Sequence, residues 1–194
     1  MRMADRMDSM KGLHVLLGVT GGAAAYKAVD LASKLTARGA TVDCVMTRSA
    51  GKLIRARSFE AVTGRAVFTK MWSSPEAYTI THIGLAEAAD VVVVAPATAN
   101  IIAKVANGVC DDLLSTVLCA CWNKPVLIAP AMNSSMWANP AVQRNVEALR
   151  AMKFEIIGPE TGRLACGAEG VGRMAEPADV LAAVEAMAGR INKS

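Results

Sequence analysis

Two apolar runs that each stop at an Ala-Pro pair constrain the fold of this chain most strongly. The runs from Val91 to Ala95 and from Val126 to Ala129 lack polar alternation, which is typical of strands covered on both faces in a parallel sheet. Each run meets a proline that cannot donate to a sheet ladder, Pro96 or Pro130, and small polar residues follow. Because ligands bind beyond the carboxyl ends of strands in open α/β sheets, we expect a site in these two loops.

Other parts of the chain repeat the order of buried strand, loop and helix. We expect further strands at residues 13–19, 40–46, 66–68 and 154–157, and helices at residues 23–38, 79–89, 100–106, 111–121, 140–152 and 177–192. This order predicts an α/β fold, a single doubly wound, Rossmann-like or flavodoxin-like domain with a mainly parallel sheet of about six strands. With 194 residues, the chain is long enough for one well-buried domain.

Composition and charge exclude several classes of protein. Hydrophobic residues make up 53% and charged residues 20%, which fits a globular core and excludes disorder. The net charge of +4 is spread evenly, so we expect neither a nucleic acid nor a membrane surface as partner. The five cysteines include no Cys-x-x-Cys pair, so we expect neither disulfides nor a metal site.

The first residues and the hydropathy profile predict the cellular compartment. The first ten residues lack the apolar core of a secretory signal, and no run reaches the roughly 18 apolar residues that a bilayer requires. We therefore expect a cytoplasmic protein with a disordered N-terminal tail at residues 1–12 and a folded domain at residues 13–194.

A glycine turn follows the first predicted strand and opens a helix. Gly21 and Gly22 let the backbone approach a ligand closely, and the helix N-terminus offers unpaired N–H groups to a phosphate. After the second strand come Thr47, Arg48 and Ser49, where a nicotinamide site would need an acidic residue. The combination favours the phosphate of a mononucleotide such as FMN. A plain tight turn, with Ser49 capping the next helix, is the structural alternative.

The loop at residues 131–137 carries side chains suited to a substrate. Asn133 offers an amide that can hold a carboxylate, Met136 a soft apolar surface, and Trp137 a large wall. An ordinary loop in which Asn133 or Ser134 caps a helix is the alternative interpretation.

Two side chains are candidates for proton transfer. His82 lies in the first turn of a predicted helix, where the helix dipole disfavours the imidazolium form, although a purely structural histidine is the common case. Cys166 lies in a glycine-rich segment, residues 158–174, whose lack of apolar periodicity predicts a mobile lid or binding loop. Arg163 and Arg173 flank this thiol, and we expect them to lower its pKa.

Four motifs in this order resemble the homo-oligomeric flavin-containing cysteine decarboxylases. The motifs are His-Ile-x-Leu, a Pro-Ala-Ser/Thr-Ala-Asn loop, a Pro-x-Met-Asn-x-x-Met-Trp loop, and Leu-Ala-Cys-Gly with a later Gly-x-Gly-x-Met. Here they stand at residues 82–85, 96–100, 130–137 and 164–174. The last motif resembles the substrate clamp of phosphopantothenoylcysteine decarboxylases.

The resemblance implies an enzyme that carries out FMN-dependent oxidative decarboxylation of a cysteine carboxylate. The implied substrate is 4'-phosphopantothenoylcysteine, which gives 4'-phosphopantetheine in coenzyme A biosynthesis. The implied assembly is a homotrimer or homododecamer with flavin sites at subunit boundaries. The implied catalytic residues are His82 and Cys166, and the implied substrate-binding residues are Asn133 and Met136. The implied FMN-binding residues are Gly21, Gly22, Ala23, Thr47, Ser49, Thr98, Ala99, Asn100, Ile101 and Ala131.

Departures from the family pattern keep other activities open. Ala168 stands where that subfamily has an acidic residue, Ile101 stands where a threonine is common, and the 194 residues hold no counterpart of the synthetase domain fused behind many bacterial decarboxylases. A peptidyl-cysteine decarboxylase that forms a C-terminal aminoenethiol in ribosomal peptide natural product biosynthesis is the main alternative. A flavin prenyltransferase or a non-enzymatic flavoprotein subunit shares the architecture, but the first would not be expected to have this Asn133 loop and Cys166 clamp.

Overall fold

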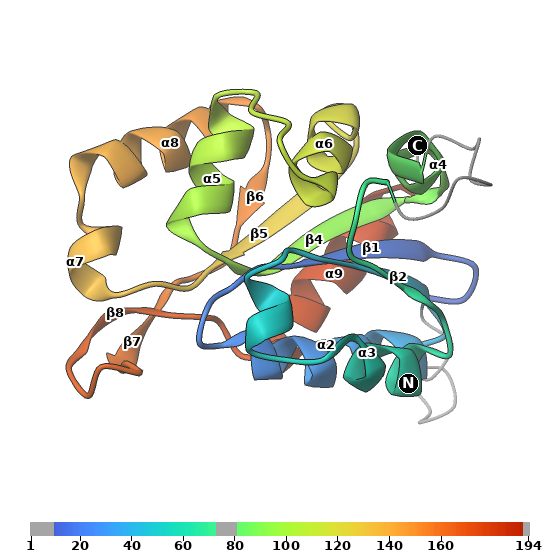
Figure 1. Cartoon of the computed structure of the whole chain (residues 1–194), viewed down its shortest axis with the longest axis horizontal. Coiled ribbons are helices and arrows are strands. Elements are labelled where there is room, and N and C mark those ends of the chain that lie inside the picture. The colour runs from blue at the N-terminus through green and yellow to red at the C-terminus, as the bar shows by residue number, and fades with distance from the viewer. Residues whose placement is uncertain (1–9, 73–80, 192–194) are drawn as a thin grey trace.

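The chain is organised around one parallel sheet. The computed structural model describes residues 10–72 and 81–191. Its main sheet has six strands in the order β3-β2-β1-β4-β5-β6, and every neighbouring pair is parallel, as predicted (Figure 1). The strands are His14–Val19 (β1), Thr41–Met46 (β2), Val67–Phe68 (β3), Val91–Ala97 (β4), Val126–Pro130 (β5) and Glu155–Ile156 (β6). The strand order reverses between β1 and β4, which is where ligands bind in sheets of this kind.

Helices cover both faces of the sheet and form two apolar cores (Figure 1). One face carries α2 (Ala25–Ala37), α3 (Ala56–Thr63) and α9 (Pro177–Ile191). The other face carries α4 (Thr81–Ala88), α5 (Ala99–Ala106), α6 (Leu113–Ala120) and α8 (Pro140–Ala151). A short 3-10 helix, η1 (Ala50–Lys52), follows β2.

The strand β4 shows why its sequence has no polar alternation. Successive side chains of a strand point to opposite faces of the sheet. Val91 and Val93 pack into the core beneath α2 and α9, whereas Val92 and Val94 pack into the core beneath α5 and α6. Because both faces are covered, every position from Val91 to Ala97 is buried and apolar.

Local sequence signals fix several helix ends. The Asp112 side chain accepts a hydrogen bond from the Ser115 N–H at 2.9 Å, and the Ser115 hydroxyl accepts one from the Asp112 N–H at 3.2 Å, which caps α6. Asn139 caps α8, and Pro140 occupies its first position, where no N–H is needed. Gly64 ends α3 in the left-handed conformation.

The structure differs from the sequence-based expectations at three places. Residues 158–174 were expected to form a mobile loop, but they contain an antiparallel hairpin of β7 (Glu160–Arg163) and β8 (Glu169–Arg173). A short helix, α7 (Ser134–Trp137), lies within the loop expected after β5. Met10 is buried and its N–H donates to the Arg38 carbonyl, so the folded part begins before residue 13. Residues 1–9 of the predicted tail lie outside the described residues.

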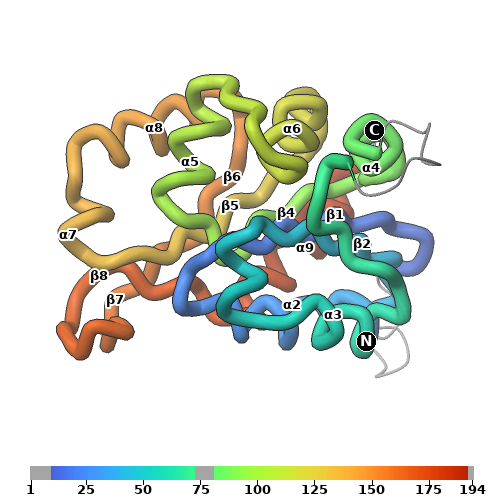
Figure 2. Tube along the Cα trace, viewed as in Figure 1, coloured from blue at the N-terminus to red at the C-terminus, as the bar shows by residue number. Residues whose placement is uncertain are grey.

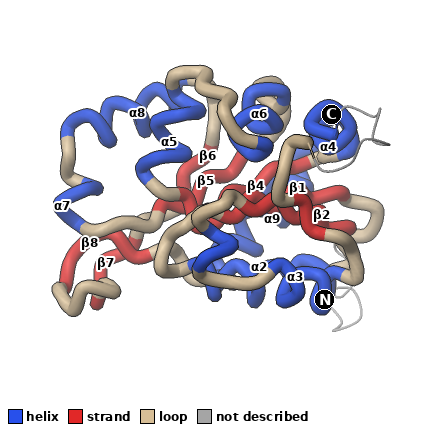
Figure 3. Tube along the Cα trace, in the orientation of Figure 1, coloured by secondary structure: helices blue, strands red, loops and turns tan. Residues whose placement is uncertain are grey.

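The long axis of the molecule separates two groups of elements. Figure 2 shows α7 and the β7–β8 hairpin at one end and α4 at the opposite end. In Figure 3 the two hairpin strands lie apart from the strands of the main sheet. None of the described helices has the length and hydropathy that crossing a membrane would require.

Candidate active site

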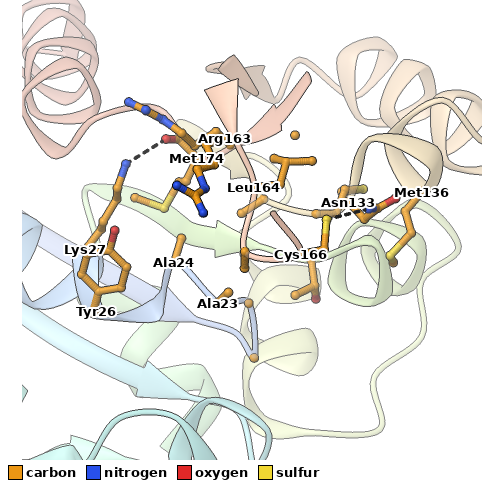
Figure 4. A pocket seen from close by; sticks show the side chains of 18 of the residues that line it. Ala23, Ala24, Tyr26, Lys27, Asn133, Met136, Arg163, Leu164, Cys166 and Met174 are labelled. Carbon is orange, nitrogen blue, oxygen red and sulfur yellow. Dashed lines mark hydrogen bonds between the residues drawn. The ribbon is translucent and has the colours of Figure 1, made fainter. Parts of the chain in front are cut away.

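A cavity of about 1140 Å³ lies beyond the carboxyl ends of β1, β4 and β5. The turn after β1, the loops after β4 and β5, and the β7–β8 hairpin all contribute to its walls (Figure 4). Eight of the residues predicted for the site line it: Gly21, Gly22, Ala23, Thr98, Ala131, Asn133, Met136 and Cys166.

The glycine turn after β1 packs closely against two neighbouring loops. A side chain at Gly21 would place its Cβ 2.4 Å from the Cβ of Ser49, so only glycine leaves the loops after β1 and β2 in contact. A Cβ at Gly22 would lie 3.3 Å from Pro96. The backbone N–H groups of Ala23 and Ala24 donate to no other described group. The turn therefore presents free N–H donors on a surface that a side chain would obstruct.

Thr20 joins the carboxyl ends of β1 and β4, and the sequence-based prediction missed it. Its buried hydroxyl donates to the Pro96 carbonyl at 2.7 Å and accepts from the Thr98 N–H at 3.1 Å. These bonds fix the loop after the cis Ala95–Pro96 peptide against the glycine turn. The sequence signal that could have identified Thr20 is its position directly after the buried strand β1.

Five other residues predicted to bind FMN do not line the cavity: Thr47, Ser49, Ala99, Asn100 and Ile101. Ala99 and Asn100 are the first two residues of α5, directly after Thr98 at the N-cap position. Ile101 is 2% exposed and packs into the core with α6 and α8, so its side chain faces away from the cavity. Thr47 accepts a hydrogen bond from the Ala50 N–H at 3.2 Å and shapes the loop that brings Ser49 to the glycine turn.

Asn133 is oriented by the helix that it caps. Its side-chain oxygen accepts a hydrogen bond from the Ser135 N–H at 2.8 Å, at the start of α7. The amide nitrogen is thereby turned toward the hairpin, where it donates to the sulfur of Cys166 at 3.5 Å. Figure 4 shows Asn133, Met136 and Cys166 together on one side of the cavity. Both interpretations of Asn133, as a helix cap and as a side chain of the site, are therefore compatible.

Cys166 lies at the tip of the hairpin with its thiol exposed. The backbone N–H of Ala168 and the amide of Asn133 both hydrogen-bond to the sulfur and lower the pKa of the Cys166 thiol. The pKa of Cys166 is therefore lowered, as the sequence predicted. The predicted cause is wrong, because neither Arg163 nor Arg173 contributes to the lowered pKa. Hydrogen bonds to the thiolate act here instead of the charges of the arginines.

The hairpin is held over the cavity by backbone contact and by ion pairs. The Met132 N–H donates to the Gly172 carbonyl at 2.9 Å, and a Cβ at Gly172 would lie 2.1 Å from the Met132 carbonyl oxygen. Beyond β8, Glu176 pairs with Lys27 of α2 at 2.9 Å and also with Arg173. Lys27 and Glu176 are 149 positions apart, so no local sequence signal could have paired them.

His82 lies apart from the other predicted catalytic residues. It is the second residue of α4 and does not line the cavity. Figures 1 and 2 show α4 at the end of the molecule opposite the hairpin that carries Cys166. Within one copy of the chain, His82 and Cys166 therefore cannot act on the same atom of a substrate.

Comparison with known proteins places the chain in a family. A family model described as Flavoprotein matches residues 3–189. The chain is 45% identical over 172 residues to the coenzyme A biosynthesis bifunctional protein CoaBC of Bacillus subtilis (strain 168), an alignment that covers 89% of the chain and 42% of that relative. The chain thus spans less than half the length of this curated relative.

Two solved structures are similar over nearly their whole length. A PPC decarboxylase mutant complexed with pantothenoylaminoethenethiol has a TM-score of 0.80 and 36% identity, and the match covers 89% of this chain and 96% of that one. The FMN-dependent cysteine decarboxylase SpaF has a TM-score of 0.79 and 33% identity, and the match covers 93% of this chain and 99% of that one. By sequence and fold, the chain belongs to the flavoprotein family, among its flavin-containing cysteine decarboxylases.

Proposed function

We propose that this protein is an FMN-dependent decarboxylase that converts 4'-phosphopantothenoylcysteine to 4'-phosphopantetheine in coenzyme A biosynthesis. The contact between the Asn133 amide and the Cys166 sulfur, at 3.5 Å in the wall of the cavity, carries the proposal. It joins a group that can bind a carboxylate to a thiol that can donate a proton. The similarity to CoaBC and to PPC decarboxylase supports this choice of substrate.

The turn after β1 fits the phosphate of FMN. The free N–H groups of Ala23 and Ala24, the close backbone at Gly21 and the hydroxyl of Ser49 form a set of donors suited to a phosphate. Thr98, Ala99, Asn100 and Ala131, with the backbone of Ile101, would lie along the flavin ring, and Gly22 and Thr47 would support the phosphate loop. When bound, FMN would supply a two-electron acceptor and donor for the cysteine side chain of the substrate.

Asn133 and Met136 would place the cysteine of the substrate. Because the Asn133 oxygen is engaged by Ser135, the NH₂ group faces the cavity and can donate to the departing carboxylate. Met136 is 48% exposed at the cavity wall and offers an apolar contact to the carbon chain. The two side chains would hold the carboxylate in one orientation while carbon dioxide leaves.

Cys166 would donate a proton to the enethiol that decarboxylation leaves. A thiol whose pKa is lowered by the Ala168 N–H and the Asn133 amide is a stronger acid than an ordinary cysteine. Ala168 acts through its backbone, so the absence of an acidic side chain there leaves this support intact. The departure at Ala168 is therefore compatible with the complete reaction.

A second copy of the chain would supply His82 as the proton acceptor of the oxidation step. Three exposed apolar side chains lie in or next to the helices at the end of the molecule that carries His82: Trp72, Ile83 and Trp122 are 86%, 39% and 74% exposed. Lys124 donates to the Glu87 and Ala89 carbonyls and so holds the turn with Trp122 against the end of α4. An apolar surface beside a separated catalytic group supports a homo-oligomer, a trimer or dodecamer, with sites shared between subunits.

Mass spectrometry of two reactions tests the proposed function. The FMN-loaded protein is incubated with 4'-phosphopantothenoylcysteine and, separately, with a peptide that ends in cysteine. We expect the first compound to lose carbon dioxide alone, because the oxidised intermediate is reduced again before release. Loss of carbon dioxide and two hydrogens from the peptide only would establish a peptidyl-cysteine decarboxylase instead.

A Cys166→Ser variant provides the matched control for this reaction. Serine keeps the shape of the side chain but is a far weaker acid, so the variant should release the oxidised enethiol. Normal formation of 4'-phosphopantetheine by this variant would contradict the role proposed for Cys166.

A further inference from the structure

The cavity extends well beyond the groups proposed to act on the cysteine. Figure 4 shows Tyr26, Lys27 and Arg163 on one side of the cavity and Asn133 and Cys166 on the other. The first three side chains have no part in the chemistry proposed above. They define a polar end of the same cavity, formed by the first turns of α2 and by the end of β7.

Most charges at this end are already balanced by other side chains. Lys27 donates to the Met174 carbonyl and pairs with Glu176. Arg173 pairs with Glu176 and with Glu160. These contacts hold α2, β7 and β8 together.

Two donors at the polar end remain available to a ligand. The guanidinium of Arg163 and the hydroxyl of Tyr26 have no side-chain partner within residues 10–72 and 81–191, and Tyr26 is 65% exposed. Asp30, the carboxylate on the same helix, pairs with Lys34. The positively charged residues that line this end are Lys27, Arg163 and Arg173, and the negatively charged ones are Asp30 and Glu176. The polar end therefore has a net positive charge.

We propose that Arg163, assisted by Tyr26, forms a subsite for the terminal phosphate of the substrate. This inference rests on the proposed function, because it assigns the opposite end of the same extended substrate. Asn133 and Cys166 take the cysteine, and the carbon chain runs along the apolar wall of Leu164 and Met174 to the cations. A guanidinium binds phosphate through two parallel hydrogen bonds and keeps its charge at all working pH values.

The subsite explains how a clamp could select a phosphorylated substrate. Arg163 ends β7, and Cys166 lies in the turn that follows, so one rigid hairpin carries both groups. The Leu164 N–H donates to the Ala168 carbonyl at 2.8 Å, and this bond closes the turn between the two strands. The same hairpin would therefore contact both ends of the substrate, with Arg163 at the phosphate and Cys166 at the cysteine.

The test compares phosphorylated and unphosphorylated substrate in wild-type protein and in Arg163→Gln. We expect Arg163→Gln to raise KM for 4'-phosphopantothenoylcysteine about 10- to 100-fold, the loss expected for a charged hydrogen-bonded contact. The value of kcat and all constants for pantothenoylcysteine should stay unchanged, and Arg163→Lys should recover part of the affinity. The matched control is Arg57→Gln, which removes a 92% exposed arginine from α3. It should leave KM and kcat for both substrates unchanged.

Three results would overturn the subsite. Equal losses for both substrates would indicate a general effect on the hairpin. Equal constants for both substrates in the wild-type protein would show that the phosphate is not bound. Loss of FMN from purified Arg163→Gln would indicate that Arg163 holds the phosphate of the cofactor and not that of the substrate.

A binding measurement separates the subsite from the proposed function. Calorimetry of the FMN-loaded protein with 4'-phosphopantetheine and with pantetheine requires no turnover. We expect tighter binding of the phosphorylated compound and loss of this preference in Arg163→Gln. If that preference is found but neither cysteine compound is decarboxylated, the proposed reaction is wrong and the phosphate subsite stands.

Discussion

At the scale of single residues, Asp43 is held from two sides within the sheet. It lies in β2 and is 5% exposed, and its carboxylate accepts a hydrogen bond from Arg65 at 2.6 Å and contacts the His14 ring at 2.6 Å. The network joins β1, β2 and the segment before β3. The sequence around His14 and around Asp43 shows only a predicted strand in each case, so it gave no sign of this network.

The Asp43 network predicts acid-sensitive stability. Burial opposes ionisation, but the hydrogen bonds from Arg65 and His14 outweigh it and hold the pKa of the Asp43 carboxyl below its usual value of 3.8. A carboxyl group with a lowered folded pKa stabilises the fold at pH values above its unfolded pKa. That stabilisation is lost as the pH falls through the folded pKa.

Asp43→Asn tests this linkage. We expect the free energy of unfolding to fall by roughly 1.5–3 kcal/mol at neutral pH, because charged hydrogen bonds are lost. The difference from wild type should begin to shrink once the pH falls below 3.8, and it should vanish below the lower pKa that Asp43 has in the folded protein. Urea unfolding between neutral and acidic pH measures this difference in the free energy of unfolding. The control is Glu147→Gln, which removes an exposed ion pair with Arg150. An equal difference at every pH would contradict the network's contribution.

At the scale of elements, the β7–β8 hairpin depends on direct backbone contact with the loop after β5. The glycine-rich segment at residues 158–174 was predicted to be mobile, but two of its glycines, Gly170 and Gly172, serve close packing. A Cβ at Gly170 would lie 3.0 Å from the Ser134 side chain, and one at Gly172 would overlap the Met132 carbonyl. The glycines therefore allow the hairpin to dock onto the loop that carries Asn133.

Gly172→Ala should displace the hairpin from the site. We expect stability to fall by about 1–3 kcal/mol, as for overpacking in a tight contact. Because Cys166 would shift away from Asn133, the variant should also release more of the oxidised enethiol than wild type does. Thermal unfolding and product analysis measure the two effects.

Gly189→Ala is the control for this variant. A Cβ at Gly189 meets nothing within 4 Å, so this change in α9 should raise stability by about 0.5 kcal/mol and leave the products unchanged. If Gly172→Ala had the same stability and products as Gly189→Ala, the docking of the hairpin would not depend on the absence of a side chain at Gly172.

At the scale of the whole molecule, the elements that carry the two predicted catalytic residues, α4 and the β7–β8 hairpin, lie at opposite ends (Figure 2). Cys166 lies in the wall of the cavity, whereas α4 carries His82 at the far end beside exposed apolar side chains. This arrangement predicts that each site takes its histidine from one subunit and its cysteine from another.

Mixed oligomers of His82→Asn and Cys166→Ser test the shared site. Neither variant alone should form 4'-phosphopantetheine. In an equal, random mixture of the two chains, about one quarter of the sites would combine an intact histidine with an intact cysteine. Co-expression followed by product analysis measures this recovery, and the two purified variants mixed without subunit exchange are the control. No recovery from confirmed mixed oligomers would contradict the shared site.

Much of the fold could be predicted because its signals are local. The strands β4 and β5 are apolar runs that end at or next to a proline, and the helices α6 and α8 begin at the capping residues Asp112 and Asn139. The same local signals predicted the loops after β1, β4 and β5 as parts of one site, and residues from all three line the cavity. The roles assigned to single residues in that site remain predictions.

The sequence by itself determined where the elements lie and which loops meet at the edge of the sheet, because hydrophobic period and turn residues act over a few positions. Only the tertiary structure decided which side chains touch. It set Asn133 against Cys166, paired Lys27 with Glu176, ordered residues 158–174 as a hairpin and separated α4 from the cavity. Such contacts join residues far apart in the chain and depend on how whole elements pack, so no local pattern records them.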